Sequence, residues 1–517
     1  MDTIPDEIYE MICGKLSERD LANAVLIDRY SRCIIENSSV LMEKLPLVIT
    51  DCENAEFSEN EKMIQPLLES RRKMTKIVIR LKTDKIMNYF QLFKKFGATT
   101  RTLEIYDYSF DSIDQLRMIM RYFSNIRVFK VQNVSFQKHE NKIINAIVQV
   151  PKLTLLQLRE IDCAHSDPKI FSLFASNHNI QLRTIRLSSN DAHFHRYTEF
   201  VDMMTKQTEL RQLTLDGLSS RNSDIFDCSD LLRCQLFKLS ITNCSFPVLK
   251  QIQNLIDTIK SQKKLASLAL LKTDIPASMT MRAYRQMFSN WVTAATLDIG
   301  DLSIFHTYHF TNRTIKNLTL HGNFAFENLP IFINFLKIFP NAISLTLRGD
   351  LPIGEKYLLN ILTILENLEH LQVPGFISRH KDSSFSNLSS LSSPKLKTLV
   401  LDYIDYNVKY FSWRNIVTNL SSIEKLVIKR DYGKVSNEII DVIVKTLKLK
   451  HLELGLGIVS EEILRSILFN SCCDMLKVLK IPKSEYQKIE RRNDFEKILS
   501  KNRVLLYLCD DEYFNSS

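Results

Sequence analysis

The sequence predicts an α/β protein in which a small N-terminal helical module precedes one long solenoid of short parallel strands and helices. Three apolar residues spaced as in L-x-x-L-x-L recur from residue 74 to residue 508. The recurrence has a period of about 27 residues, which is typical of repeat architectures. Between the triplets, apolar residues fall at helical spacing. Each strand and helix can bury its inner side only against its neighbours, so the repeats are expected to stack.

The first 45 residues precede the repeats and follow a different pattern. Pro5 suits the first turn of a helix, and Ile8, Ile12 and Leu16 are expected on one face of it. So short a segment cannot bury all of its apolar surface, which indicates that part of it faces a partner. A helical cap that only covers the open end of the solenoid is the alternative.

Seventeen repeats are predicted over residues 74–509, each contributing one strand. Successive residues of a strand face opposite sides, so the second and third residues of each triplet point into the core. The middle residues of the triplets are Ile77, Leu103, Phe129, Leu156, Ile185, Leu213, Leu239, Leu268, Leu297, Leu318, Leu345, Leu371, Leu399, Leu426, Leu452, Leu479 and Leu506. Residues 46–73 are expected to form a linker and cap, and residues 510–517 an acidic and polar tail. Residues 44–49, where the N-terminal module meets this linker, offer an irregular first strand.

Several stretches between the strands have one apolar helical face. The clearest are Val248, Leu249, Ile252, Leu255, Ile256 and Ile259; Phe332, Phe335, Leu336 and Phe339; and Ile439, Ile440, Ile443 and Leu447. The step from Leu297 to Leu318 is the shortest between middle residues and predicts a shortened helical segment there.

The repeats resemble the leucine-rich-repeat family. Leu236-x-x-Leu239-x-Ile241-x-x-Cys244 matches the longer family signature. The resemblance covers roughly residues 70 to 510 and implies a curved horseshoe, with the strands on the concave side and the helices outside.

Residues 1–45 resemble an F-box. Ile4-Pro5-Asp6-Glu7 stands for its opening, Asp20-Leu21 for its Asp-Leu pair and Arg29-Tyr30 for its close. An F-box before a leucine-rich solenoid characterises substrate receptors of SCF ubiquitin ligases. The resemblance implies docking of a Skp-type adaptor, and through it a cullin complex, at Ile4, Pro5, Glu7, Ile8, Ile12, Leu16, Leu21, Val25 and Tyr30.

Residues that flank each middle residue are expected on the concave face, where a protein substrate would bind. The basic ones are Lys76, Arg80, Lys130, Arg159, Arg186, Lys238, Arg348, Lys425, Lys429 and Lys480. They outnumber the acidic ones, Glu104, Asp216, Asp298, Asp402 and Glu453, by five. The whole chain carries a net charge of +9. The excess is therefore concentrated on this face, which favours an acidic partner.

Two other functions remain open. The chain could act as a leucine-rich scaffold or inhibitor without ubiquitination, or bind nucleic acid through the same basic face. Nucleic acid ranks lower because acidic residues interrupt the basic ones and few aromatic side chains interleave with them.

Signals for chemistry are few. Glycine numbers only 11, and no phosphate-binding loop or nucleophile motif occurs. His193, His195, His306 and His309 form tight pairs that favour loop positions over a metal site. We expect no enzyme activity, no cofactor and no metal.

The ten cysteines lack finger-like pairs, no apolar run could span a bilayer, and the start lacks a signal peptide pattern. A reducing cytoplasmic or nuclear location is expected. A serine-rich stretch between residues 383 and 393 fits a polar loop or a phosphorylation-controlled site.

Overall fold

The computed structural model of the chain describes two compact units. The described residues are 5–16, 21, 24–25, 29–50, 64–70, 72–81, 86–136, 160–164, 166, 168–175, 181–188, 203–204, 206–217, 234–244, 249–273, 292–298, 311–322, 329–349, 353–374, 376–377, 395–402, 422–430, 449–456, 464, 467, 475–489 and 492–511. The first unit comprises Met1–Leu265 with Lys272–Pro276, and the second comprises Ala266–Leu271 with Ala277–Ser517.

The described part of the first unit begins with N-terminal helices and continues as a parallel sheet. Its main strands are β1 (Leu47–Thr50), β2 (Lys76–Arg80), β3 (Thr102–Tyr106), β5 (Val128–Gln132), β7 (Glu160–Ala164), β8 (Thr184–Ser188), β9 (Gln212–Asp216) and β10 (Lys238–Thr242). Each pairs in parallel with the next along the chain. The short strands β4 (Ser109–Phe110) and β6 (Ser135–Phe136) form a separate pair.

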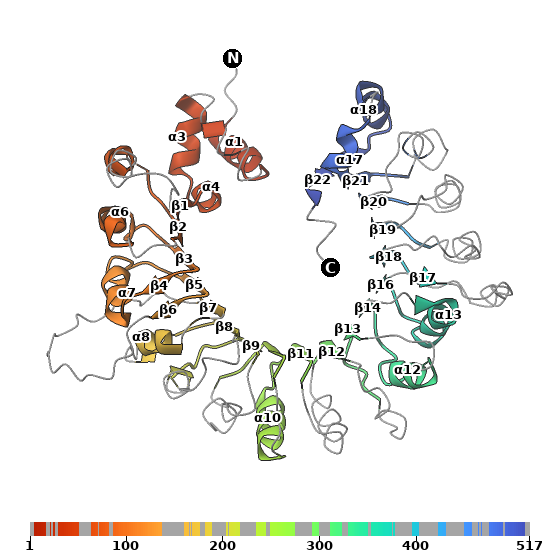
Figure 1. Cartoon of the computed structure of the whole chain (residues 1–517). Coiled ribbons are helices and arrows are strands. Elements are labelled where there is room, and N and C mark those ends of the chain that lie inside the picture. The colour runs from red at the N-terminus through yellow and green to blue at the C-terminus, as the bar shows by residue number, and fades with distance from the viewer. Residues whose placement is uncertain are drawn as a thin grey trace. The chain divides into compact units, whose positions relative to one another are not determined.

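Helices of the first unit lie at the N-terminus and between the strands. They are α1 (Asp6–Cys13), α3 (Arg29–Asn37), α4 (Ser39–Lys44), α6 (Phe90–Phe96), α7 (Ile113–Met120), α8 (Ser172–Ala175), α10 (Leu249–Ser261) and the 3-10 helices η1 (Ile86–Tyr89) and η2 (Pro168–Phe171). The predicted apolar face of α10 is confirmed at Ile252, Leu255, Ile256 and Ile259, which are all buried, whereas Val248 lies outside the described residues. Figure 1 shows α6, α7, α8 and α10 on one side of these strands.

The second unit repeats the same arrangement. Its main strands are β11 (Ser267–Leu271), β12 (Ala294–Asp298), β13 (Asn317–His321), β14 (Ser344–Arg348), β16 (His370–Val373), β18 (Thr398–Leu401), β19 (Lys425–Arg430), β20 (His451–Leu456), β21 (Val478–Pro482) and β22 (Leu505–Cys509). All of them pair in parallel and in sequence order. The remaining elements are α12 (Leu329–Leu336), β15 (Ile353–Gly354), α13 (Glu355–Ile364), β17 (Phe376–Ile377), α17 (Lys483–Gln487) and α18 (Arg492–Lys501). Phe332, Phe335, Leu336 and Phe339 are buried as predicted, whereas Ile439, Ile440, Ile443 and Leu447 lie outside the described residues.

The predicted register is confirmed at fifteen of the seventeen middle residues, which pair with one another from strand to strand. We call each such residue the middle position of its strand. The expected α/β architecture of repeated parallel strands and helices is therefore present in both units.

Two assignments of the register are wrong. In the fourth repeat Ile161, not Leu156, occupies the middle position, pairing with Phe129 and Ile185. The leucines of residues 153–158 fit the repeat pattern as well as Ile161 and Cys163 do. Apolar spacing alone therefore could not decide between a strand centred on Leu156 and one centred on Ile161. In β12 the middle position is Ala295 and not Leu297, because apolar residues alternate there over two equivalent registers.

The expected irregular first strand is confirmed and joins the N-terminal helices to the repeats. Strand β1 pairs with β2, with Leu47 opposite Ile77. The guanidinium of Arg72 also donates a hydrogen bond of 2.8 Å to the Glu36 carboxylate at the end of α3. The helices and the first repeat are thus held by both a strand pairing and a side-chain bond.

The turns after the strands explain how the fold manages with little glycine. The residue four places after the middle position has a left-handed backbone in several repeats, as at Asp107 (φ 52°), Asn133 (φ 53°) and Asn243 (φ 52°). Asparagine and aspartate tolerate this conformation better than other residues with a side chain. The next residue of the signature, Cys244, is buried, and its thiol donates to the carbonyl oxygen of Thr242 at 3.1 Å.

Candidate functional site

Helix α1 has apolar side chains on two sides, and only one of them is covered. Tyr9 and Cys13 face a small core with α3 and α4. That core contains Cys13, Leu21, Ala24, Val25, Ile35 and Leu41, with Tyr9, Leu16 and Leu45 packed against it. The prediction that Leu16 shares a helical face with Ile8 and Ile12 is therefore wrong, because α1 ends at Cys13 and Leu16, beyond the helix, packs against this core.

The uncovered side of α1 carries a cluster of apolar side chains. Ile8 is 43% exposed, Met11 58% and Ile12 49%, and Pro5 at the start of the helix is exposed as well. We call Pro5, Ile8, Met11 and Ile12 the α1 patch. The sequence prediction included three of these four residues. It missed Met11, although the spacing of residues 8, 11 and 12 places all three on one helical face.

Polar contacts fix the start of α1 against α3. The Tyr30 hydroxyl donates a hydrogen bond of 2.8 Å to the carboxylate of Asp6, and the rings of Tyr30 and Tyr9 meet edge to face at 5.6 Å. The bond to Asp6 raises the pKa of Tyr30 to about 12, so the phenol keeps its proton. Tyr30 and Glu7 are exposed beside the α1 patch, as the prediction requires, and Ile4 lies outside the described residues.

Two further residues expected to bind an adaptor are interior. Leu21 is 0% exposed and Val25 is 6% exposed, both within the core of the helical module. Together with Leu16 they hold the helices together, and a partner that docks on this arrangement reaches Pro5, Glu7, Ile8, Ile12 and Tyr30 instead.

The strand face opposite the core side chains is the second candidate surface. We call it the inner face; it consists of the residues one before, one after and three after each middle position. In the first unit its centre is Glu104, whose carboxylate lies 3.5 Å from the Lys76 ammonium and 3.3 Å from that of Lys130. Burial alone would raise the pKa of Glu104, but the two ammonium groups outweigh it and hold the pKa below its usual value. Lys76 and Lys130, both predicted to bind substrate, are thus paired within the chain.

Asp162 lies on β7, opposite Lys130 of β5 on the inner face. Its carboxylate lies 3.7 Å from the guanidinium of Arg186. Burial raises the pKa of Asp162, and the charges of Arg186 and Lys130 only partly offset this. Asp162 and Glu160 were absent from the predicted inner face because the register of this repeat was misplaced.

Glu453 is the centre of a second cluster, in the second unit. Its side chain is 2% exposed and lies 2.8 Å from the Lys425 ammonium and 3.4 Å from that of Lys480. His451 Nε2 is also 2.8 Å from the same oxygen. Burial lowers the pKa of His451, and the neighbouring lysines lower it further against the opposing pull of Glu453.

Asp402 pairs with the third lysine of this region. Its carboxylate lies 3.1 Å from the Lys429 ammonium and accepts a hydrogen bond of 3.0 Å from the Gln372 amide. The side chains of Lys429 and Asp402 are 17% and 15% exposed. Lys425, Lys429 and Lys480 are therefore all engaged by acidic residues of the same face.

The remaining predicted basic residues differ in their surroundings. The guanidinium of Arg80 lies 5.0 Å from the centre of the Tyr106 ring. Lys238 and Arg348 are exposed. Arg159 lies outside the described residues, and its repeat contributes Glu160 and Asp162 to the inner face instead.

This register changes the charge of the inner face. Its basic residues in the described strands are Lys76, Arg80, Lys130, Arg186, Lys238, Arg348, Lys425, Lys429 and Lys480; its acidic residues are Glu104, Glu160, Asp162, Asp216, Asp298, Asp402 and Glu453. The excess is two positive charges, not five. The expected excess of five positive charges, more than half of the chain's net charge of +9, is therefore wrong.

Metal ligands and thiols are the remaining side chains able to perform chemistry. No group of three or more histidine, cysteine, aspartate or glutamate side chains able to hold a metal ion occurs in the described part of the chain. Among the described cysteines, the buried thiols of Cys13, Cys163, Cys234 and Cys244 form no disulfide, and burial raises the pKa of the Cys163 thiol. The two histidine pairs and the serine-rich stretch lie outside the described residues.

Comparisons with known proteins were made over the whole sequence. No protein-family model matches the chain, and no curated protein matches it. Among the helices that the structure describes, none is both long and apolar enough to cross a lipid bilayer.

Proposed function

We propose that this chain is a non-catalytic substrate receptor of an SCF-type ubiquitin ligase, acting in the cytoplasm or nucleus. The α1 patch docks a Skp-type adaptor, which links the chain to a cullin complex, and the inner face recruits a protein substrate. The observation that carries the proposal is the uncovered apolar side of α1, with Ile8, Met11 and Ile12 exposed, on a module that resembles an F-box. Exposed apolar clusters of this kind are typical of protein-binding sites.

The connection between the module and the repeats supports this role. A receptor must hold its substrate at a fixed place relative to its ligase, which requires a stiff joint between the two binding surfaces. The pairing of β1 with β2 and the bond between Arg72 and Glu36 supply one on the side of the first repeat.

The substrate would contact the inner face through its exposed side chains. Lys238 and Arg348 are the strongest basic candidates because both are exposed, whereas Lys76, Lys130, Arg186, Lys425, Lys429 and Lys480 lie close to acidic residues. The paired residues orient each other and give the face a pattern of alternating charge. Such a pattern selects a partner by complementarity more than by net charge.

The proposal is tested by purifying the intact chain from cells through an affinity tag and identifying what it retains. We expect a Skp-type adaptor and a cullin in stoichiometric amounts. The substrate surface is then tested with Lys238→Glu and Arg348→Glu, each of which should lose a partner protein while keeping the adaptor. Retention of neither adaptor nor cullin by the unchanged chain would contradict the proposal.

A scaffold or inhibitor without ligase duty is the second candidate function. This function is favoured if the purified chain retains a partner through the inner face but never retains the adaptor. Nucleic-acid binding is a weaker candidate, because the described inner face carries nearly as many acidic as basic residues. It would be recognised by a steep fall of affinity with salt.

A further inference from the structure

A pocket lies in the first unit where the N-terminal helices meet the first repeats. It has a volume of about 450 Å³ and is lined by residues from the end of α3, from α4 and the residue before it, and from the segments that precede β2, β3 and β5. Pockets of this size are typical of small-molecule sites. None of its lining residues belongs to the α1 patch or to the inner face, so it is separate from both candidate docking surfaces.

The charge of the pocket is positive. Lys73, Arg101 and Arg127 line it, and Glu36 is the one carboxylate among its lining residues. That carboxylate is already engaged by Arg72 at 2.8 Å and by Arg32 at 3.5 Å. A cationic ligand would be repelled here, whereas an anion would meet groups that attract it.

Arg101 and Arg127 lie side by side at equivalent positions of neighbouring repeats. We call the row of residues at this position, from strand to strand, the column. Each lies two residues before the middle position of its strand, and the backbone N–H of Arg127 donates to the carbonyl oxygen of Arg101 at 2.7 Å. Arg183 and Arg211 occupy the same position on β8 and β9, and are also linked by a backbone bond, of 3.0 Å. Adjacent strands lie about 4.8 Å apart, so like charges at this spacing repel. Arg183 has the carboxylate of Glu209 at 3.5 Å, outside the pocket.

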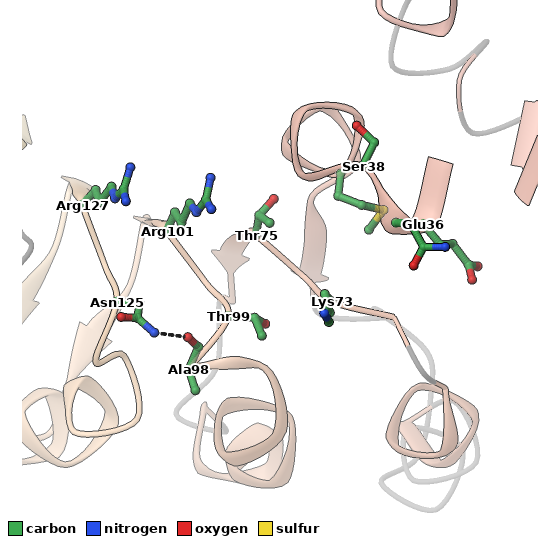
Figure 2. Close-up of a pocket in the computed structure, with 11 residues that line it drawn as sticks. Glu36, Ser38, Lys73, Thr75, Ala98, Thr99, Arg101, Asn125 and Arg127 are labelled. Carbon is green, nitrogen blue, oxygen red and sulfur yellow. Dashed lines mark hydrogen bonds between the residues drawn. The ribbon is translucent and has the colours of Figure 1, made fainter. Parts of the chain in front are cut away.

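A buried hydroxyl provides an independent sign of a ligand. Thr75 occupies the same column position before β2, and its backbone oxygen accepts from the Arg101 N–H at 2.7 Å. Thr75 is 6% exposed, lines the pocket, and its hydroxyl has no hydrogen-bond partner among the described residues. Figure 2 shows the side chains of Thr75, Arg101 and Arg127 pointing to the same side of the strand starts as Ser38. A buried hydroxyl left unbonded costs free energy that a ligand oxygen would recover.

We propose that this pocket binds a small, multiply charged oxyanion, of the phosphate-ester or polycarboxylate class. Arg101 and Arg127 hold its oxygens with their guanidinium groups, whose planar donors match phosphate and carboxylate geometry. Lys73 adds a third positive charge, and the Thr75 hydroxyl donates to the innermost oxygen.

The test is isothermal titration calorimetry on the full chain, with inorganic pyrophosphate and citrate as separate probes. We expect saturable binding of one anion per chain, and a melting temperature that rises with its concentration. Tighter binding of pyrophosphate assigns the site to phosphate esters, and tighter binding of citrate to polycarboxylates. No saturable binding of either probe would overturn the proposal.

Variants then locate the site. Arg101→Gln and Arg127→Gln should each weaken binding about tenfold or more, because each removes charge-assisted hydrogen bonds. The double variant Arg183→Gln and Arg211→Gln is the matched control, since it removes two arginines of the same column outside the pocket, and it should bind normally. An equal loss in the control would show general attraction to the column and overturn the proposal.

The hydroxyl has its own test. Thr75→Val keeps the shape of the side chain and should weaken binding several-fold, while Thr75→Ser should bind as the unchanged chain does. Equal affinity of the Thr75→Val variant would contradict a bond between this hydroxyl and the anion.

Discussion

The carboxylate of Glu453 lies 2.8 Å from the ammonium nitrogen of Lys425, on the neighbouring strand. The Glu453 side chain is 2% exposed; Lys480 approaches it from the strand on the other side, β21, and His451 from its own strand, β20. This acidic residue is therefore the structural centre of the basic residues that the sequence suggested for substrate binding. Reversing the charge of Lys425 or Lys480 would set two carboxylates against each other and disturb the fold as well as the surface.

Glu453→Gln is expected to lower the free energy of unfolding by about 1 to 3 kcal/mol, because it leaves partly buried cations without their counter-charge. Chemical denaturation monitored by circular dichroism measures the change. Glu424→Gln is the control, because Glu424 pairs with Lys450 at a similar distance, 2.7 Å, on an exposed part of the same strands. It should cost less than about 1 kcal/mol. Equal losses in the two variants would contradict the central role of Glu453.

His451 makes the stability of the second unit sensitive to pH. Its pKa in the folded chain lies below the ordinary value of 6.5, so below pH 6.5 the unfolded chain binds more protons than the folded one. Stability is therefore complete above this pH and is lost as the pH falls toward the folded-state pKa. Denaturation between pH 7.5 and 5 should show a decline that is smaller in His451→Gln. An identical decline in that variant would assign the effect to other groups.

The carboxylates of Glu104 and Asp162 should contribute to the free energy of unfolding with opposite pH dependence, although both face the same side of the sheet. The lowered pKa of Glu104 means that it stabilises the fold above pH 4.5 and loses this effect as the pH falls through its folded-state pKa. Glu104→Gln should cost about 1 to 3 kcal/mol near neutral pH and progressively less in acid.

The raised pKa of Asp162 means that its ionised form is disfavoured in the folded chain, and stability from this group grows as the pH falls. Asp162→Asn should therefore leave the unfolding free energy at pH 7 unchanged or raise it by up to about 1 kcal/mol. Urea denaturation of both variants at pH 7 and pH 4 measures the contrast. A similar loss in both variants at pH 7 would show that these burial and charge effects do not control stability.

The sequence could predict most of the strand register, because a buried strand demands apolar residues at fixed spacing. It failed where two registers were equally apolar, at Ile161 and at Ala295, and there only the pairing with neighbouring strands decides. Sequence spacing also placed Lys425 and Lys480 correctly on the inner face. It could not show that both meet Glu453, because that contact depends on three strands lying side by side.

The helical module was harder to predict than the repeats. Ile8 and Leu16 both fit one helical apolar pattern, but α1 ends at Cys13, and packing against α3 and α4 leaves Ile8 exposed while it covers Leu16 in part. Leu21 is an interior residue for the same reason. Leu21→Ala should accordingly destabilise the module by about 2 to 5 kcal/mol, as buried leucine truncations do.

The most direct test of the proposed function is the affinity of the full chain for a purified Skp-type adaptor, measured by calorimetry with the double variant Ile8→Lys and Ile12→Lys beside it. Val40→Lys is the matched control, because Val40 is 60% exposed on α4 of the same module and outside the α1 patch. We expect the unchanged chain and Val40→Lys to bind equally, and the double variant to bind at least about a hundredfold more weakly, since each lysine buries a charge in the interface. All three should melt at similar temperatures. Absence of binding by the unchanged chain, or undiminished binding by the double variant, would contradict the assignment of the α1 patch as an adaptor site.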